Sequence, residues 1–262
     1  MQIINPYRFP SGATPTYPLD DYTGADGAYS TRLLRSAYAG DCMYVRRSSD
    51  DLEAVIGFDA DGNLDETALL AHTGANDGFV RVWYDQSGSG NDMSQAAHSL
   101  QPRIVNAGVM ETLTGGQAAL NNNAAPQHLA ATLDVATCFA VMETSDTTSV
   151  IFVKTASVYV GAYQAGSSSA TASGYVVQES YVDDVSVANH RGDLSTAVSD
   201  GSVHIYGLRI TASTTQAWRP FGYASGGFEY DGKYSEIIIY PDDQSANMSG
   251  ITGMINDKYS AY

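Results

Sequence analysis

The sequence predicts an all-β protein, an antiparallel sandwich of two sheets with a short helix near its start and an amphipathic helix at its end. Short apolar segments recur from about residue 100 onward, separated by clusters of Gly, Ser and Asn, as is typical of sandwiches. Hydrophobic residues make up 44% of the 262 residues, enough for a sizeable core. No apolar run approaches the ~18 residues of a membrane-spanning helix, so we expect no membrane insertion.

The first 27 residues are expected to form an extended arm, and the globular domain to cover 28–262. Four prolines in the arm disfavour helix: Pro6, Pro10, Pro15 and Pro18. The domain is expected to begin with a short helix at 28–38, which ends before Gly40. Its apolar stripe is formed by Leu33, Leu34, Ala37 and Tyr38.

Strands follow with period-two alternation and turn residues between them. We expect them at or near 42–47, 54–58, 79–84, 103–106, 149–154, 157–163, 174–178, 184–189, 203–211, 215–221 and 234–240. Pro241 ends the last strand, and a helix at 244–260 is expected to begin at Asp242 or Asp243 as its cap. Its apolar residues repeat at three and four: Met248, Ile251, Met254, Ile255 and Tyr259.

The net charge of −16 excludes several partners. It would repel nucleic-acid phosphates and anionic membrane surfaces. The first ten residues lack a positive segment followed by an apolar one, so we expect no secretory signal and synthesis in a cytoplasm. Cys42 and Cys138 match no zinc or redox spacing and are either two buried thiols or one long-range disulfide.

An acidic turn is the candidate metal site. Asp59, Asp61, Asn63 and Asp65 place oxygen atoms at every second residue, a spacing that could hold calcium. The spacing is not that of an EF-hand, and the alternative is an acidic turn in which Asp65 caps a helical segment through Leu70. No other cofactor is expected.

Known catalytic motifs are absent from the sequence. It contains no His-Glu-x-x-His, no phosphate-binding P-loop and no Gly-x-Ser-x-Gly, which argues against zinc hydrolases, nucleotide-binding proteins and serine hydrolases. Four glutamates sit in or beside predicted strands and are expected to be structural or at the surface: Glu143, Glu179, Glu229 and Glu236.

The stretch 218–230 is the candidate ligand surface. Sugar sites combine aromatic faces with polar side chains, and this stretch offers both beside a Gly-rich loop. The candidate platforms are Trp218, Tyr223 and Tyr230, and the candidate hydrogen-bonding groups are Arg219 and Glu229. The alternative is that Trp218 and Phe221 belong to the core.

Three stretches carry a family resemblance: Ala28–Leu34 with Tyr38–Gly40, Val45–Asp50, and Trp83–Asp92 with Gln95. In this order they resemble the start of the arabinofuranosidase B catalytic domain, which implies a concanavalin A-like jelly roll. They also resemble bacteriophage virion proteins that carry a lectin-like domain, and the opening Ile4–Phe9 is more similar to those proteins.

Within these stretches we expect structural roles. Asp85 and Gln86 can satisfy backbone groups of the tight turn that follows them. Arg46 and Arg47 can pair with nearby aspartates, namely Asp50, Asp51 or Asp85.

The catalytic acids of the hydrolase family find no counterpart in this sequence. The family's general acid lies in a Gly-rich loop before the last core strand, and the matching stretch, Phe221–Gly227, has no carboxylate. The family's nucleophile is a Glu after a Cys-rich segment, a context that Glu143 and Glu179 lack. The resemblance therefore implies a non-enzymatic protein.

We expect a phage structural protein located in the virion, as a tail fibre, a receptor-binding component or a capsid decoration protein. Its partners would be other virion proteins, contacted through the arm at 1–27, and a cell-surface glycan, in a homo-oligomer or another symmetric assembly. The alternatives are an arabinofuranosidase-like glycoside hydrolase and a cytoplasmic carbohydrate-binding module of the host.

Overall fold

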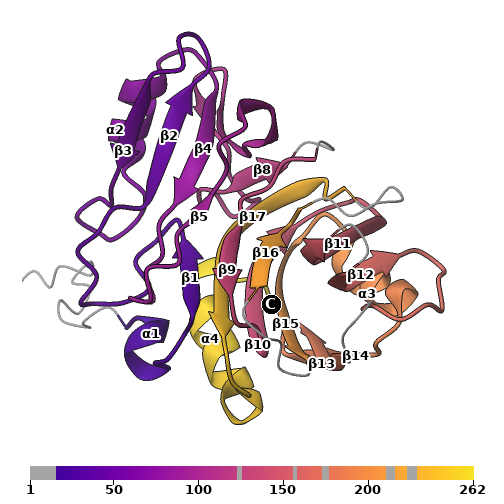
Figure 1. The fold of residues 1–262 in the computed structure, drawn as a ribbon. Coiled ribbons are helices and arrows are strands. Elements are labelled where there is room, and N and C mark those ends of the chain that lie inside the picture. Colours follow the sequence, from indigo (N-terminus) through magenta and orange to yellow (C-terminus); the bar gives the residue numbers. More distant parts are fainter. Residues whose placement is uncertain (1–15, 123–125, 156–157, 173–176, 211–215, 223–228) are drawn as a thin grey trace, which may run out of the picture.

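The computed structural model describes the chain except for residues 1–15, 123–125, 156–157, 173–176, 211–215 and 223–228 (Figure 1). Two antiparallel sheets dominate it, which confirms the predicted all-β class. The smaller sheet has the order β12 (Val158–Gln164), β11 (Thr148–Thr155), β16 (Gln216–Pro220) and β9 (Ala131–Leu133). Among the described residues, no helix is both long enough and apolar enough to cross a bilayer.

The larger sheet has 13 strands. Its order is β14 (Val185–Val187), β13 (Val177–Val182), β15 (Val203–Ile210), β10 (Thr137–Glu143), β17 (Gly232–Tyr240), β8 (Leu120–Asn122), β6 (Arg103–Asn106), β4 (Gly78–Trp83), β2 (Met43–Arg47) and β3 (Glu53–Ile56). Three short strands join it off this path: β1 (Gly27–Ser30) on β17, β5 (Met93–Ser94) on β4, and β7 (Val109–Met110) on β6.

Figure 1 shows how these sheets are arranged. The small sheet faces the curved β13–β15–β10 part of the large sheet, and the β2–β3–β4 end extends away from the sandwich. The helices are α1 (Pro18–Asp21), α2 (Glu66–Thr73), α3 (Arg191–Val198) and α4 (Met248–Tyr259), with single 3-10 turns at His98–Leu100 and Ser245–Asn247.

The core has two main parts. The first lies between the sheets and includes Phe152, Tyr163 and Trp218. The second lies on the opposite face of β10 and β17, where Phe139 and Ile238 pack against α4. The molecule therefore has three layers here, with β10 and β17 buried on both faces.

The closing helix was predicted correctly, but its cap was not. Four of the five residues of its stripe are buried, Ile251 and Ile255 completely, while Met254 is only half-buried. The N-cap residue is Asn247, which makes no side-chain cap hydrogen bond. Asp243 Oδ1 instead accepts the Ser245 N–H at 2.8 Å and so stabilises the 3-10 turn before the helix.

The helix predicted at 28–38 is wrong. Residues 27–30 form β1, which pairs with β17 through contacts such as Ala28 with Ile238, and all four residues are buried. Beyond β1, backbone N–H groups find distant acceptors: Leu33 donates to Gly62 O at 2.7 Å and Leu34 to Gln86 Oε1 at 2.8 Å. These tertiary hydrogen bonds replace the ladder that a helix would require.

The arm also differs from the expectation where it is described. Pro18 occupies the start of α1 rather than blocking a helix, because its missing N–H is not needed there. Leu19 is 4% exposed, and Tyr240 Oη donates to Tyr22 O at 2.8 Å. Residues 16–27 therefore pack on the domain, and the rest of the predicted arm lies outside the described residues.

Candidate functional site

The prediction that Trp218 and Tyr230 are exposed aromatic platforms is wrong. Trp218 is completely inaccessible and Tyr230 is 1% exposed. Phe221 stacks on Tyr234 with ring centroids 4.4 Å apart and lies 4.6 Å from Tyr230. The alternative interpretation, that Trp218 and Phe221 belong to the core, is confirmed. The reason is that the rings of Trp218, Phe221 and Tyr230 belong to the core between the two sheets.

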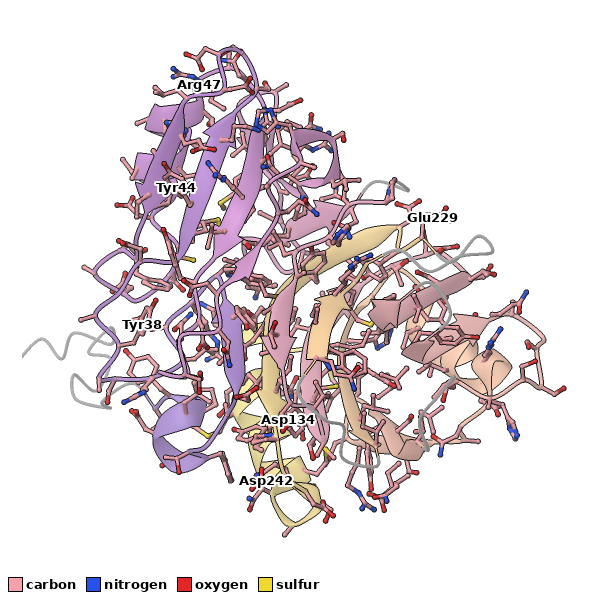
Figure 2. The ribbon with its side chains drawn as sticks, viewed as in Figure 1. Tyr38, Tyr44, Arg47, Asp134, Glu229 and Asp242 are labelled. Atoms are coloured by element: carbon pink, nitrogen blue, oxygen red, sulfur yellow. The ribbon has the colours of Figure 1, made fainter. Side chains whose placement is uncertain are left out.

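The other three predicted ligand residues have different placements. Tyr223 lies outside the described residues. Arg219 and Glu229 are half-buried, and Glu229 sits just before the start of β17 (Figure 2). These two polar groups, unlike the aromatic rings, keep access to solvent.

A pocket opens where β10 ends and β17 begins, two residues from Glu229. Its volume is about 350 Å³, and it is lined by side chains that include Asn121, Glu143, Thr144, Asp231 and Lys233. It forms because Glu143 and Lys233 are cross-strand partners at the last rung of the β10–β17 ladder. We refer to it as the β10–β17 pocket.

The groups of the β10–β17 pocket are partly fixed by the backbone. Glu143 Oε2 accepts the Thr114 N–H at 2.6 Å, and Lys233 Nζ donates to Thr112 O at 2.6 Å. Next to the pocket, burial raises the pKa of Asp146, and the charges of Asp231 and Glu229 raise it further. The pocket can therefore both donate and accept hydrogen bonds, and its Asp231 lies close enough to Asp146 to influence it.

The side chains of the acidic turn form hydrogen bonds within the protein. Asp59 Oδ1 accepts the N–H groups of Asp61 and Asn63 at 2.9 and 2.8 Å. Asp65 Oδ1 accepts the Ala68 N–H at 2.9 Å and caps α2, as the alternative interpretation predicted. Asn63 Oδ1 accepts from Lys258 Nζ at 2.6 Å. These residues do not converge on one point, and no metal-binding cluster is found in the described part of the chain.

A second pocket lies beside this turn, and we refer to it as the acidic-turn pocket. Its volume is about 330 Å³, and its lining includes Asp59, Asn63, Glu66, Gln117 and Lys258. The pocket lies between the 59–66 segment, the 115–118 turn and the end of α4. Asp61 and Asp65 are not among its lining residues.

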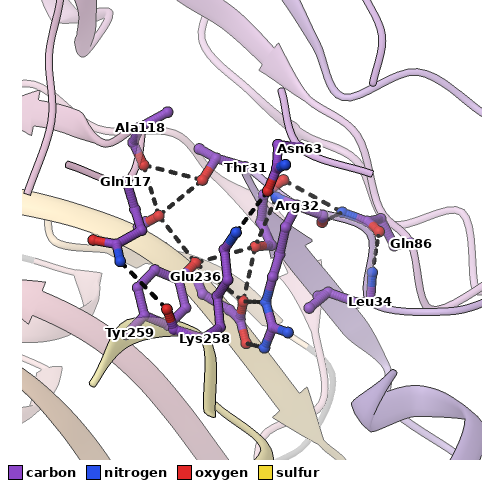
Figure 3. Close-up of polar contacts among 12 residues, drawn as sticks. Thr31, Arg32, Leu34, Asn63, Gln86, Gln117, Ala118, Glu236, Lys258 and Tyr259 are labelled. Atoms are coloured by element: carbon purple, nitrogen blue, oxygen red, sulfur yellow. Dashed lines mark hydrogen bonds and ion pairs between the residues drawn. The ribbon is translucent and has the colours of Figure 1, made fainter. Parts of the chain in front are cut away.

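A buried charged cluster adjoins residues of the acidic-turn pocket, because Arg32 follows the lining residue Thr31 and Tyr259 follows the lining residue Lys258 (Figure 3). Arg32 binds Glu236 through two hydrogen bonds, Nε to Oε2 at 2.8 Å and Nη2 to Oε1 at 3.0 Å. Ser30 Oγ and Tyr259 Oη also donate to Glu236 Oε2, at 2.8 and 3.2 Å. The Glu236 side chain is 1% exposed, so this carboxylate is enclosed by four donors.

The turn after β4 is organised by Asp85, as the sequence predicted. Asp85 is 5% exposed and accepts the N–H groups of Ala28, Ser87, Gly90 and Asn91, the first at 2.8 Å. Gln86 accepts from Leu34 and donates to Arg32 O. The predicted ion pairs of the neighbouring stretch also form, Arg46 with Asp51 and Arg47 with Asp50, both at 2.7 Å.

Three features of these sites were not predicted from the sequence: Arg32, Lys258 and the pairing of Glu143 with Lys233. Arg32 and Glu236 are 204 residues apart, so only the β1–β17 pairing brings them together. Lys258 carried one usable signal, since it lies between the apolar Ile255 and Tyr259 of a predicted helix.

Comparison with solved structures supports the sandwich fold. A GH54 α-L-arabinofuranosidase soaked with a cyclic sulfate inhibitor is 17% identical, with a TM-score of 0.56, over 92% of this chain and 65% of that chain. An arabinofuranosidase complexed with arabinofuranosyl-α-1,2-xylobiose is 18% identical, with a TM-score of 0.57, over 92% of this chain and 64% of that chain. The present chain thus covers less than two thirds of each enzyme. No family model and no curated protein matches it.

Proposed function

We propose that this chain is a non-enzymatic structural protein of a bacteriophage virion, a tail fibre, receptor-binding or capsid decoration component, that binds cell-surface glycan. The observation that carries the non-enzymatic part is the state of Glu236, the carboxylate of the last core strand. It is enclosed by Arg32, Ser30 and Tyr259 and is not free to act on a substrate. The Gly-rich stretch before that strand contains no carboxylate.

The β10–β17 pocket is the proposed glycan site. Its carboxylates, amide and ammonium match the hydroxyl groups of a sugar, and it adjoins Glu229 from the predicted ligand surface. Assignment to a virion rests on the resemblance of Ala28–Leu34, Val45–Asp50 and Trp83–Asp92 to phage virion proteins. Fold similarity alone does not assign function.

Three measurements test this proposal. Mass spectrometry and antibody labelling of purified particles should detect the protein on the virion, and binding to host cells should fall at least about tenfold in Lys233→Met or Asp231→Asn. Light scattering should give a mass that is a multiple of one chain. Absence from particles would reject the virion role, and unchanged cell binding by folded variants would reject the pocket.

One observation favours a second candidate, a glycoside hydrolase. Glu143 and Asp231 line one pocket, and the pKa of the adjacent Asp146 is raised by burial, features that also occur in glycosidase sites. A chromogenic arabinofuranoside separates the two functions. We expect no turnover, whereas turnover abolished by Glu143→Gln or Asp231→Asn would establish the hydrolase.

A further inference from the structure

The acidic-turn pocket contains an acceptor that nothing in the described structure satisfies. Gln117 Oε1 is buried and has no hydrogen-bond partner among the described residues. Its amide nitrogen donates to Lys258 O at 3.3 Å, which fixes the orientation of the side chain (Figure 3). A buried acceptor without a donor costs free energy, so a ligand that donates a hydrogen bond there removes this cost.

Lys258, another residue that lines the pocket, offers a hydrogen-bond donor. Lys258 Nζ donates to Asn63 Oδ1 at 2.6 Å, and an ammonium carries further N–H bonds that a ligand can accept. Burial and the nearby charge of Arg32 lower the pKa of Lys258. Both effects make an added acceptor at this nitrogen favourable.

The charge of the pocket selects the class of ligand. The carboxylates of Asp59 and Glu66 disfavour an anion, in keeping with the net charge of −16, while the ammonium of Lys258 disfavours a metal ion. Leu64 and Met110 add an apolar part to the lining. The volume of about 330 Å³ lies at the lower end of the range for small-molecule sites, about 300–1,000 Å³. An uncharged, compact molecule with several hydroxyl groups satisfies all of these conditions.

We propose that the acidic-turn pocket binds one residue of a neutral saccharide, with a hydroxyl donating to Gln117 Oε1 and another accepting from Lys258 Nζ. This inference extends the proposed glycan binding to a second subsite, separate from the β10–β17 pocket. It gives the turn at Asp59–Asp65 a role in sugar recognition in place of the calcium site.

Saturation-transfer NMR tests the inference on the full chain. The probes are the methyl glycosides of L-arabinofuranose, D-galactose and D-glucose, with glycerol as the negative control. We expect transfer to at least one glycoside. In Gln117→Leu and in Lys258→Met, only the part of the transfer that comes from the β10–β17 pocket should remain. Asp59→Asn should weaken transfer and its matched control, Asp61→Asn, should not, because Asp61 is in the same turn but does not line the pocket.

The outcomes separate this inference from the proposed function. Thermal unfolding identifies variants that fail to fold, and if Lys258→Met is one of them, Gln117→Leu and Asp59→Asn still decide the matter. Transfer that persists in these variants but is lost in Lys233→Met overturns the second subsite and leaves the β10–β17 pocket in place. Absence of transfer from every glycoside to the wild-type protein also overturns it.

Discussion

Single residues hold distant parts of this chain together, and Asp85 is the clearest example. Its carboxylate accepts four backbone N–H groups, three from the turn after β4 and one from Ala28 in β1. The residue types Asp-Gln-Ser-Gly predicted a tight turn stabilised by side chains. They could not predict the bond to Ala28, because that contact depends on the position of β1 in the sheet.

Replacement of Asp85 tests this role. Asp85→Asn keeps the size but has one acceptor oxygen in place of two, so two of the four N–H groups lose their acceptor. We expect the free energy of unfolding to fall by about 2–4 kcal/mol in urea titration. Asp92→Asn, which affects one part-buried hydrogen bond from the Asp85 N–H, should have a much smaller effect. Equal effects would contradict the proposed role.

The buried pair of Arg32 and Glu236 gives a second test. Glu236→Gln leaves the Arg32 guanidinium buried without a counter-charge, so we expect a loss of about 3–5 kcal/mol in stability. Arg32→Met combined with Glu236→Leu should recover much of that loss, because no charge is then left unpaired. Chemical denaturation of the wild type and the two variants measures this, and a double variant no more stable than Glu236→Gln would refute the explanation.

At the scale of elements, the turn between β13 and β14 is tied to β15 by a charged contact. His204 Nδ1 lies 2.6 Å from Asp183 Oδ2, and Nε2 lies 2.9 Å from Asp200 Oδ1. Burial alone would lower the pKa of His204, but the hydrogen bonds and charges of the two aspartates outweigh it and raise the pKa.

This arrangement predicts a pH dependence. Because the pKa of His204 is higher in the folded than in the unfolded state, protonation of His204 stabilises the fold. This contribution is complete below the unfolded-state pKa of about 6.5 and is lost as the pH rises through the folded-state pKa. The wild type should therefore exceed His204→Gln in Tm by roughly 2–4 °C at pH 5.5, with the difference shrinking toward pH 8. A difference that grows with pH in thermal scans would show that the histidine is neutral in the folded protein.

The packing of α4 gives a prediction with an internal control. Ile255 is fully inaccessible against β10 and β17, so Ile255→Ala should cost about 2–5 kcal/mol through lost burial and a cavity. Asp257→Ala on the exposed side of the same helix should stay within about 0.5 kcal/mol. Denaturation midpoints of both variants measure the contrast.

Elements with a clear one-sided pattern were predictable, and those set by tertiary contacts were not. The spacing of Met248, Ile251 and Ile255 predicted α4, and alternation predicted β2 and β4. The last strand was predictable although both of its faces are buried, because Pro241 marks its end. β10 escaped notice because both of its faces are buried, so Thr137–Glu143 shows no alternation. β1 was taken for a helix because four residues carry too short a pattern.

At the scale of the whole molecule, the described contacts set how much of the N-terminus can be removed. Deletion of 2–15 retains the buried Leu19 and the contact of Tyr22 with Tyr240, so we expect a folded domain. Deletion of 2–22 also removes Leu19 from the second core and the contact of Tyr22 with Tyr240, and should lower the Tm by several degrees. If the arm binds other virion proteins, the shorter deletion should fold normally yet be missing from purified particles.

The pairing of β1 with β17 also has a consequence in time. Ser30 and Glu236, which meet across this pair, are 206 residues apart in the chain. At about 5–20 residues per second, the ribosome needs on the order of 10–40 s to make the intervening segment. During this interval β1 has no strand to pair with, and the large sheet cannot be completed until the residues of β17 have emerged from the ribosome. Such high contact order implies slow, largely post-translational folding, in which a nascent chain stalled before residue 232 exposes the edges that chaperones shield.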